Sequence, residues 1–153
     1  MERRDWTIAV PWVLSIVTIL IGIGTFYAEQ RQANRKPFLE EQLDLGFQAS
    51  TVVATLATTT DRDEWNAARI KFWLLYWGPL SVVEDKGVEG CMVSIGKLVP
   101  GPAAVTPDLP MARLETLSYR LSHKVRDMVR TSWGVDLSPL PDRASQDDRC
   151  DVE

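Results

Sequence analysis

The sequence predicts an all-α protein, with a single N-terminal transmembrane helix followed by a small helical bundle of three to four helices. Three observations lead to this fold class. Residues 6–28 contain no charged side chain. Apolar residues beyond position 37 recur at steps of three and four, which is typical of amphipathic helices. No convincing alternation of apolar and polar residues and no Asn-Gly pair indicates a strand or a hairpin.

The uncharged run, WTIAVPWVLSIVTILIGIGTFYA, is long enough to cross a membrane, because about 20 helical residues span a hydrocarbon core of about 30 Å. Trp12 lies near one end, and Phe26 and Tyr27 lie at the other, as expected of aromatic rings at membrane interfaces. The run is longer than the apolar region of a cleavable signal peptide, and bulky Phe26 stands where cleavage after residue 28 needs a small side chain. We therefore expect residues 1–28 to form an uncleaved anchor.

Basic residues flank the run on both sides, with Arg3 and Arg4 before it and Arg31, Arg35 and Lys36 after it. Because the positive-inside rule counts Lys and Arg, this tally is nearly level. The N-terminal tail is very short, so its translocation is feasible. We expect an anchor in the cell (inner) membrane of a bacterium, with the soluble domain on the cytoplasmic side.

Small and hydroxyl side chains follow one face of the run at steps of three and four: Ser15, Thr18, Gly22 and Thr25. A face of small residues lets membrane helices approach closely. The face is a candidate for self-association. Membrane lipid, a second copy of the chain and another membrane protein are therefore the expected partners.

A polar segment, residues 29–37, joins the anchor to the bundle domain, residues 38–134. Pro37 disfavours a helical conformation at the residue before it, so we expect the helix to be interrupted there. An amphipathic helix then follows, with its apolar face formed by Phe38, Leu45, Ala49, Val52 and Leu56.

Asp61, with Glu64 three residues later, forms a capping box that predicts the start of the next helix. This helix is expected to extend to about residue 85, with Gly87 as its stop signal and a kink or split near Gly78 and Pro79.

A short helix is predicted in VEGCMVSIGKLV, and a loop with several prolines follows it. The last helix is expected from Pro110 to Trp133, with Leu117 and Leu121 on its apolar face and Gly134 at its end. It is rich in Lys and Arg. Residues 135–153 form an acidic tail with little to bury, predicted to be disordered, which either pairs with the basic helix or stays solvated.

The stretch IKFWLLYWGPL, residues 70–80, is apolar nearly all round a helix. Phe72 and Tyr76 share the core face, whereas Ile70, Leu74 and Trp77 form a second stripe at steps of four and three. Three interpretations of this stripe remain open: burial at the centre of the bundle, docking of a partner or second copy, and contact with a membrane surface.

Arg69 lies four residues from both Trp65 and Trp73. Its guanidinium is expected to stack on an indole ring or to pair with a carboxylate such as that of Glu84. Neither arrangement indicates catalysis.

Catalytic, cofactor-binding and metal-binding patterns are missing from the sequence. The single histidine, His123, lacks the Glu-x-x-His spacing of diiron bundles, and Ser94-x-x-Lys97 lacks the other motifs of penicillin-recognising enzymes. Cys91 and Cys150 lie in segments of different character, so we expect two free thiols, which favours a reducing compartment. A net charge of −4 gives no sign of nucleic-acid binding.

Three functions remain compatible with these residues. The first is a non-enzymatic, membrane-anchored interaction module that binds itself or a larger membrane assembly. The second is a membrane-associated enzyme or cofactor-binding subunit with a pocket lined by Trp65, Trp73 and Trp77. The third is a membrane-active effector whose apolar helix contacts lipid.

The segments ANRKPFLEEQLDLGFQAS, FWLLYWGPLSVVED and VEGCMVSIGKLVP resemble small bacterial membrane-anchored helical proteins that are uncharacterised. The resemblance covers roughly residues 30–100. It implies the order anchor, polar segment and helical domain, and it implies no activity.

Overall fold

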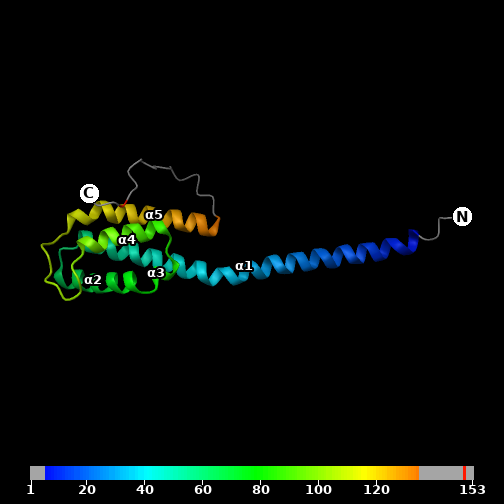
Figure 1. Ribbon diagram of the computed structural model, residues 1–153, viewed down its shortest axis with the longest axis horizontal. Helices are drawn as coiled ribbons and strands as arrows, with labels where there is room; N and C mark the ends of the chain where they lie inside the picture. Colours follow the sequence, from blue (N-terminus) through cyan, green and yellow to red (C-terminus); the bar gives the residue numbers. More distant parts are fainter. Residues whose placement is uncertain (1–5, 135–149, 151–153) are drawn as a thin grey trace. The chain divides into compact units, whose positions relative to one another are not determined.

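The computed structural model describes residues 6–134 and Cys150, and all regular structure in this part of the chain is helical (Figure 1). The all-α prediction and the helical bundle are therefore confirmed. The elements are, in order, α1 (Trp6–Thr58), α2 (Arg62–Trp77), α3 (Leu80–Val83), α4 (Lys86–Leu98), the 3₁₀ turn η1 (Ala112–Leu114) and α5 (Glu115–Trp133).

Helix α1 is continuous through Pro37, so the predicted interruption at this residue is wrong. A proline inside a helix removes one hydrogen bond to the carbonyl four residues earlier, here that of Ala33. Because Ala33 is exposed, water can satisfy its carbonyl and the helix continues. By its internal contacts the chain nevertheless divides into two compact units, Met1–Pro37 and Phe38–Glu153, which are described separately below.

The bundle unit buries the apolar face that the sequence predicts for α1. Leu45, Ala49, Val52 and Leu56 are all buried, whereas Phe38 is half exposed. Gln42 is also buried, and its side-chain amide donates a hydrogen bond of 2.6 Å to the carbonyl of Val83 at the end of α3. This bond ties the turn after α2 to α1.

The start of α2 follows the predicted capping pattern. The Asp61 carboxylate accepts hydrogen bonds from the backbone N–H groups of Asp63 and Glu64, at 2.8 and 3.0 Å. The Glu64 carboxylate does not return to the backbone of Asp61. It accepts instead from the hydroxyl of Thr59, which itself accepts from the Asp61 N–H.

Helix α2 ends at Trp77, and α3 begins after Pro79, so the split predicted near Gly78 is confirmed. A side chain at Gly78 would collide with the carbonyl oxygen of Leu74, which leaves glycine as the residue that fits this turn. Gly87, predicted as a stop signal, lies inside α4 instead. The reason is that Asp85 caps a new helix, its carboxylate accepting from the Val88 N–H at 2.9 Å.

Helices α4 and α5 pack against each other, and α5 buries the face predicted from its sequence. Leu117, Leu121, Val125 and Met128 are buried. Gly134 ends the helix in the left-handed conformation, with φ of +62°, as the stop signal predicted.

Cys91 of α4 forms a disulfide with Cys150, with the two Cα atoms 4.8 Å apart, so the expectation of two free thiols is wrong. Both cysteines are buried. The long sequence separation of 59 residues concealed a pairing that the folded chain brings together. The rest of the acidic tail predicted to be disordered lies outside the described residues.

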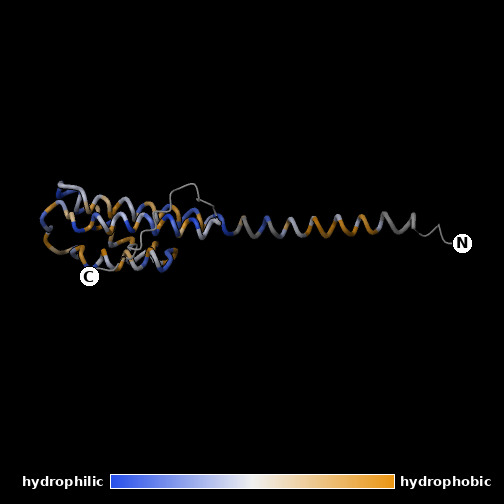
Figure 2. The backbone as a smooth tube through the Cα atoms, turned by 90° about the horizontal axis from the view of Figure 1, so that it is seen from above, coloured by the Kyte–Doolittle hydropathy of each residue, from blue (hydrophilic) through white to orange (hydrophobic). Residues whose placement is uncertain are grey.

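The first unit consists of the helical segment before Phe38. The large apolar side chains from Trp12 to Tyr27 are 45–70% exposed, and Figure 2 shows hydrophobic residues along this segment. Within the described part of the chain, no helix combines the length and the apolar character that a membrane crossing requires.

Candidate interaction surfaces

An apolar stripe lies exposed on α2. Ile70, Leu74 and Trp77, called the α2 stripe from here on, are 52%, 66% and 76% exposed. Phe72, on the other side of the same helix, is fully buried. Burial of this stripe at the centre of the bundle is therefore excluded, and the two remaining interpretations are docking and membrane contact.

The ring of Trp77 is held by other aromatic rings although it is exposed. It stacks on Trp73 with 6.3 Å between ring centroids, and its edge-to-face contact with Tyr76 measures 4.6 Å. Trp73 is fixed in turn, because its indole N–H donates to the carbonyl of Pro100 at 3.0 Å. The stripe thus presents a large, pre-oriented ring, the type of residue that contributes most at protein interfaces.

Arg69 is buried and makes the stacking contact that the sequence suggested. Its guanidinium lies 5.1 Å from the centroid of the Trp65 ring, and it donates a hydrogen bond of 2.6 Å to the carbonyl of Ala104. The Trp65 indole N–H donates to the carbonyl of Leu56 at 3.2 Å. These contacts join α1, α2 and the proline-rich loop, which gives Arg69 a structural role.

The three tryptophans proposed to line a cofactor pocket differ widely in burial. Trp65 is fully buried with its indole N–H already bonded, whereas Trp77 points to solvent on another face. Trp73 lies between the two, partly buried.

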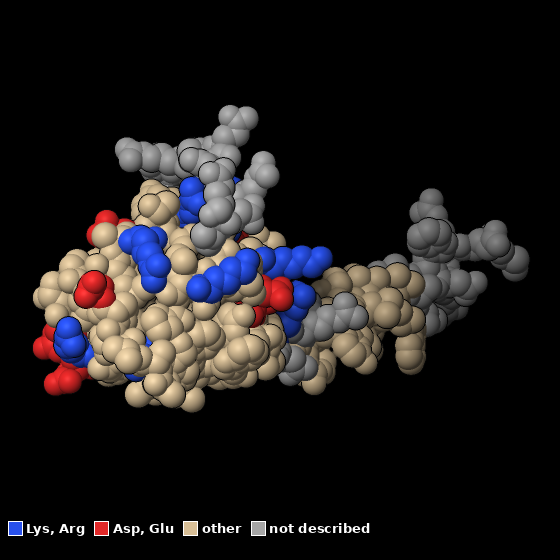
Figure 3. Space-filling view, turned by 60° about the vertical axis from the view of Figure 1, so that its left-hand side comes forward, with Lys and Arg blue, Asp and Glu red and all other residues tan. Residues whose placement is uncertain are grey.

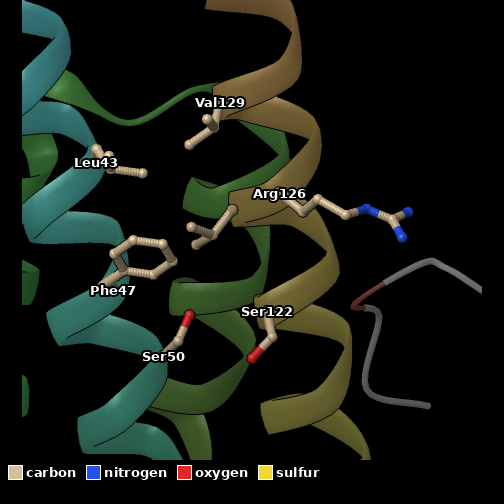
Figure 4. A pocket seen from close by; sticks show the side chains of 7 residues that line it. Leu43, Phe47, Ser50, Ser122, Arg126 and Val129 are labelled. Atoms are coloured by element: carbon tan, nitrogen blue, oxygen red, sulfur yellow. The ribbon is translucent and has the colours of Figure 1, made fainter. Parts of the chain in front are cut away.

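The bundle unit has a groove between α1 and α5, which the sequence did not predict (Figure 4). It has a volume of about 340 Å³. We call it the α1–α5 groove, and its lining residues are Leu43, Phe47, Ser50, Ser122, Val125, Arg126 and Val129. In Figure 4, Leu43 lies level with Val129 at one end of the groove, and Ser50 lies level with Ser122 at the other.

The groove forms where the two helices approach each other closely. A Cβ atom on Gly46 would come within 2.8 Å of the Val125 side chain, so glycine lets α5 pack against α1 here. Phe47, the next residue, is turned off the buried face and is 60% exposed. The signal in the sequence was therefore a large aromatic residue beside a helical glycine, outside the regular apolar face.

The polar groups of the groove are few. The Ser122 hydroxyl donates to the carbonyl of Ser118 at 3.1 Å, and the Ser50 hydroxyl is buried without a hydrogen-bond partner. The Arg126 side chain starts at the groove and extends away from it in Figure 4. The hollow is therefore mainly apolar, with charge only at its rim.

Glu84 is the one described group whose pKa departs clearly from its usual value. Burial and, to a smaller extent, the nearby negative charges of Glu89 and Asp85 together raise the pKa of its carboxyl to about 7. No group of three His, Cys, Asp or Glu side chains in the described chain is arranged to hold a metal ion. His123 packs on Tyr119, with 4.3 Å between ring centroids.

The small face of the first unit lies on an exposed part of its helix. The hydroxyls of Thr18 and Thr25 donate to carbonyls of their own helix, at 2.9 Å to Leu14 and 3.1 Å to Ile21. Nothing lies within 4 Å of a Cβ placed on Gly22. The face is therefore open to a neighbour, and self-association through it stays a prediction.

No family model matches the sequence, and no curated protein and no solved structure is similar to it. The case for a function therefore rests on the residues of this chain.

Proposed function

We propose that the protein is a non-enzymatic, single-pass membrane-anchored module whose helical bundle binds another protein through the α2 stripe. The observation that carries the proposal is the exposure of Ile70, Leu74 and Trp77 on a helix whose opposite face is fully buried. Contiguous exposed apolar surface marks interaction sites on soluble domains. On the face shown in Figure 3, most of the surface is neither acidic nor basic.

The stripe is suited to a protein partner because its ring is already oriented. Trp77 stacks on Trp73, which is hydrogen-bonded to the loop after α4. An ordered side chain loses little conformational freedom on binding, which favours affinity.

The anchor belongs to the same proposal and rests on the sequence. The uncharged run extends over residues 6–28. The side chains that the structure describes in this run begin at Trp12, so the described part is shorter than the about 20 residues that a crossing needs. The side chains from Trp12 to Tyr27 are largely exposed, and an apolar helix surface of this kind requires a cover. Lipid supplies that cover, with the small face at Ser15 and Gly22 left for a neighbouring helix.

The disulfide supports an orientation opposite to the one expected from the short N-terminal tail. Disulfides such as Cys91–Cys150 form and persist mainly in oxidising compartments. The tally of basic residues is nearly level, so it opposes neither orientation strongly. We therefore propose that the bundle lies on the oxidising side of the membrane.

A photo-crosslinking amino acid at position 74, in the full chain and in the cells that make the protein, tests the docking function. We expect a protein adduct from position 74 and none from position 105, a matched control because Val105 is 89% exposed in a loop. Ile70→Gln should suppress the adduct. A purely lipid adduct from position 74, or no adduct at all, rules out protein docking by the α2 stripe.

A further inference from the structure

We propose that the α1–α5 groove binds a second copy of this chain, and that the two copies are related by a twofold axis that runs along the helices. Phe47 of each copy enters the groove of the other. This surface is distinct from the α2 stripe, so the pairing does not depend on the proposed docking function.

The two walls of the groove share one spacing. Residues at successive steps of four and three line both of them: Leu43, Phe47 and Ser50 on α1, and Ser122, Arg126 and Val129 on α5. This alternation lets side chains of one helix fit between those of another. The walls of a second copy therefore have the same side-chain spacing as the groove walls that they contact.

Phe47 is the residue with most to gain from such a partner. It is 60% exposed, yet it borders an apolar hollow of about 340 Å³ that Leu43 and Val129 close at one end. In Figure 4 its ring turns toward α5 across the groove. A large aromatic side chain beside an unfilled apolar hollow is typical of an anchor residue in an interface.

The outer flanks of the two walls carry opposite charges. On α1, Glu40 and Asp44 lie three residues before Leu43 and Phe47, and on α5, Arg130 lies four residues after Arg126, so each charge is adjacent to its wall. Asp44 and Arg130 are both exposed. A second copy is repelled if its α1 faces α1 of the first copy, because both flanks are then acidic. It is attracted if its α5 faces α1 of the first copy, because a basic flank then meets an acidic one.

A twofold axis along the helices produces the attractive arrangement. In a twofold contact, a residue of the first copy that contacts a second residue of its partner is matched by the same contact with the copies exchanged. If α1 of one copy faces α5 of the other, then α5 of the first also faces α1 of the second. Figure 4 places Leu43 level with Val129, and the rotation keeps that level, so Asp44 of one copy comes opposite the turn that carries Arg130 of the other. The α1 segments of the two bundle units then run in the same direction.

The test is the mass of the full chain in mild detergent, measured by light scattering over a series of concentrations. We expect the wild type to form dimers and Phe47→Gln to raise the dissociation constant at least about tenfold, the effect of losing an anchor residue. Asp44→Arg and Arg130→Asp should each weaken the dimer, and the two changes together should restore it. Helical circular dichroism on heating checks that each variant is folded.

Two controls separate this interface from the others. Val105→Gln removes an exposed apolar side chain from a loop and should leave the dissociation constant unchanged. Ile70→Gln with Leu74→Gln should also leave it unchanged, because the α2 stripe is a different surface. A monomeric wild type, a dimer that withstands Phe47→Gln, or a combined charge reversal no better than its single changes overturns the proposal.

Discussion

Replacing Phe72 should strongly destabilise the protein, whereas replacing residues of the α2 stripe should barely change its stability, although all of them lie on one helix. Phe72 is fully buried and contacts Trp73 and Tyr76, at 5.2 and 5.9 Å between ring centroids. Phe→Ala in a core costs about 3–5 kcal/mol, and the lost aromatic pairs place Phe72→Ala toward the upper end of that range. A domain of this size is stable by about 5–15 kcal/mol, so this single change removes a large part of the total.

Ile70→Gln combined with Leu74→Gln should change the free energy of unfolding by less than about 1 kcal/mol, because exposed positions usually contribute within about 0.5 kcal/mol each. Both side chains are more than half exposed, and glutamine is as good a helix former as isoleucine or better. The double change removes apolar surface without leaving a cavity.

Urea denaturation of the full chain in mild detergent, followed by the near-ultraviolet circular dichroism of the aromatic side chains, measures both effects. The wild type and Val105→Gln serve as references, since Val105 is an exposed apolar residue outside any helix. A double polar variant that loses as much stability as Phe72→Ala would refute the reasoning, because it would mean that the stripe is covered within the chain.

Other changes have equally definite outcomes. Leu121→Ala should lower the free energy of unfolding by about 2–5 kcal/mol in the same denaturation assay, and a loss below about 0.5 kcal/mol contradicts the assignment of the buried face of α5. Because burial raises the pKa of Glu84 from 4.5 to about 7, its contribution to stability is complete below pH 4.5 and is lost as the pH rises through 7. Glu84→Gln should therefore make the urea midpoint less dependent on pH between pH 4.5 and 8. An unchanged pH dependence would mean that Glu84 is not the group responsible. Cys150→Ser opens a covalent link between positions 59 residues apart and should cost up to about 4 kcal/mol under oxidising conditions, with no difference from wild type once reductant is added. Carbonate at high pH should leave the full chain in the membrane fraction, and its release would contradict the anchor.

Features set by a few neighbouring residues were predictable from the sequence. Asp61 begins α2 because its carboxylate reaches the N–H groups of the first turn, and Gly134 ends α5 because it adopts a positive φ. The split at Gly78 likewise follows from the local backbone. In each case the deciding interaction joins residues within one helical turn, so their separation in the sequence determines their distance in the structure.

Features that depend on residues far apart in the chain were missed. The α1–α5 groove exists because Gly46 admits Val125, an approach between two helices that neither helix reveals alone. The disulfide required Cys150 to return to α4, and composition indicated a tail with nothing to bury. Pro37 was misread for the opposite reason, since a local rule was applied where solvent offered the carbonyl another partner.

The disulfide also decides which part of the bundle carries a mechanical load. A pull on the end of the chain beyond Cys150 is transmitted through the sulfur bridge to Cys91 in the middle of α4. Helix α5 lies within the covalent loop between the two cysteines, so it is shielded from that force. Tension between the N-terminal helix and the chain beyond Cys150 would therefore be resisted by α1, α2, α3 and the first half of α4. Helix α5 would separate from the bundle under this force only after the bridge is reduced.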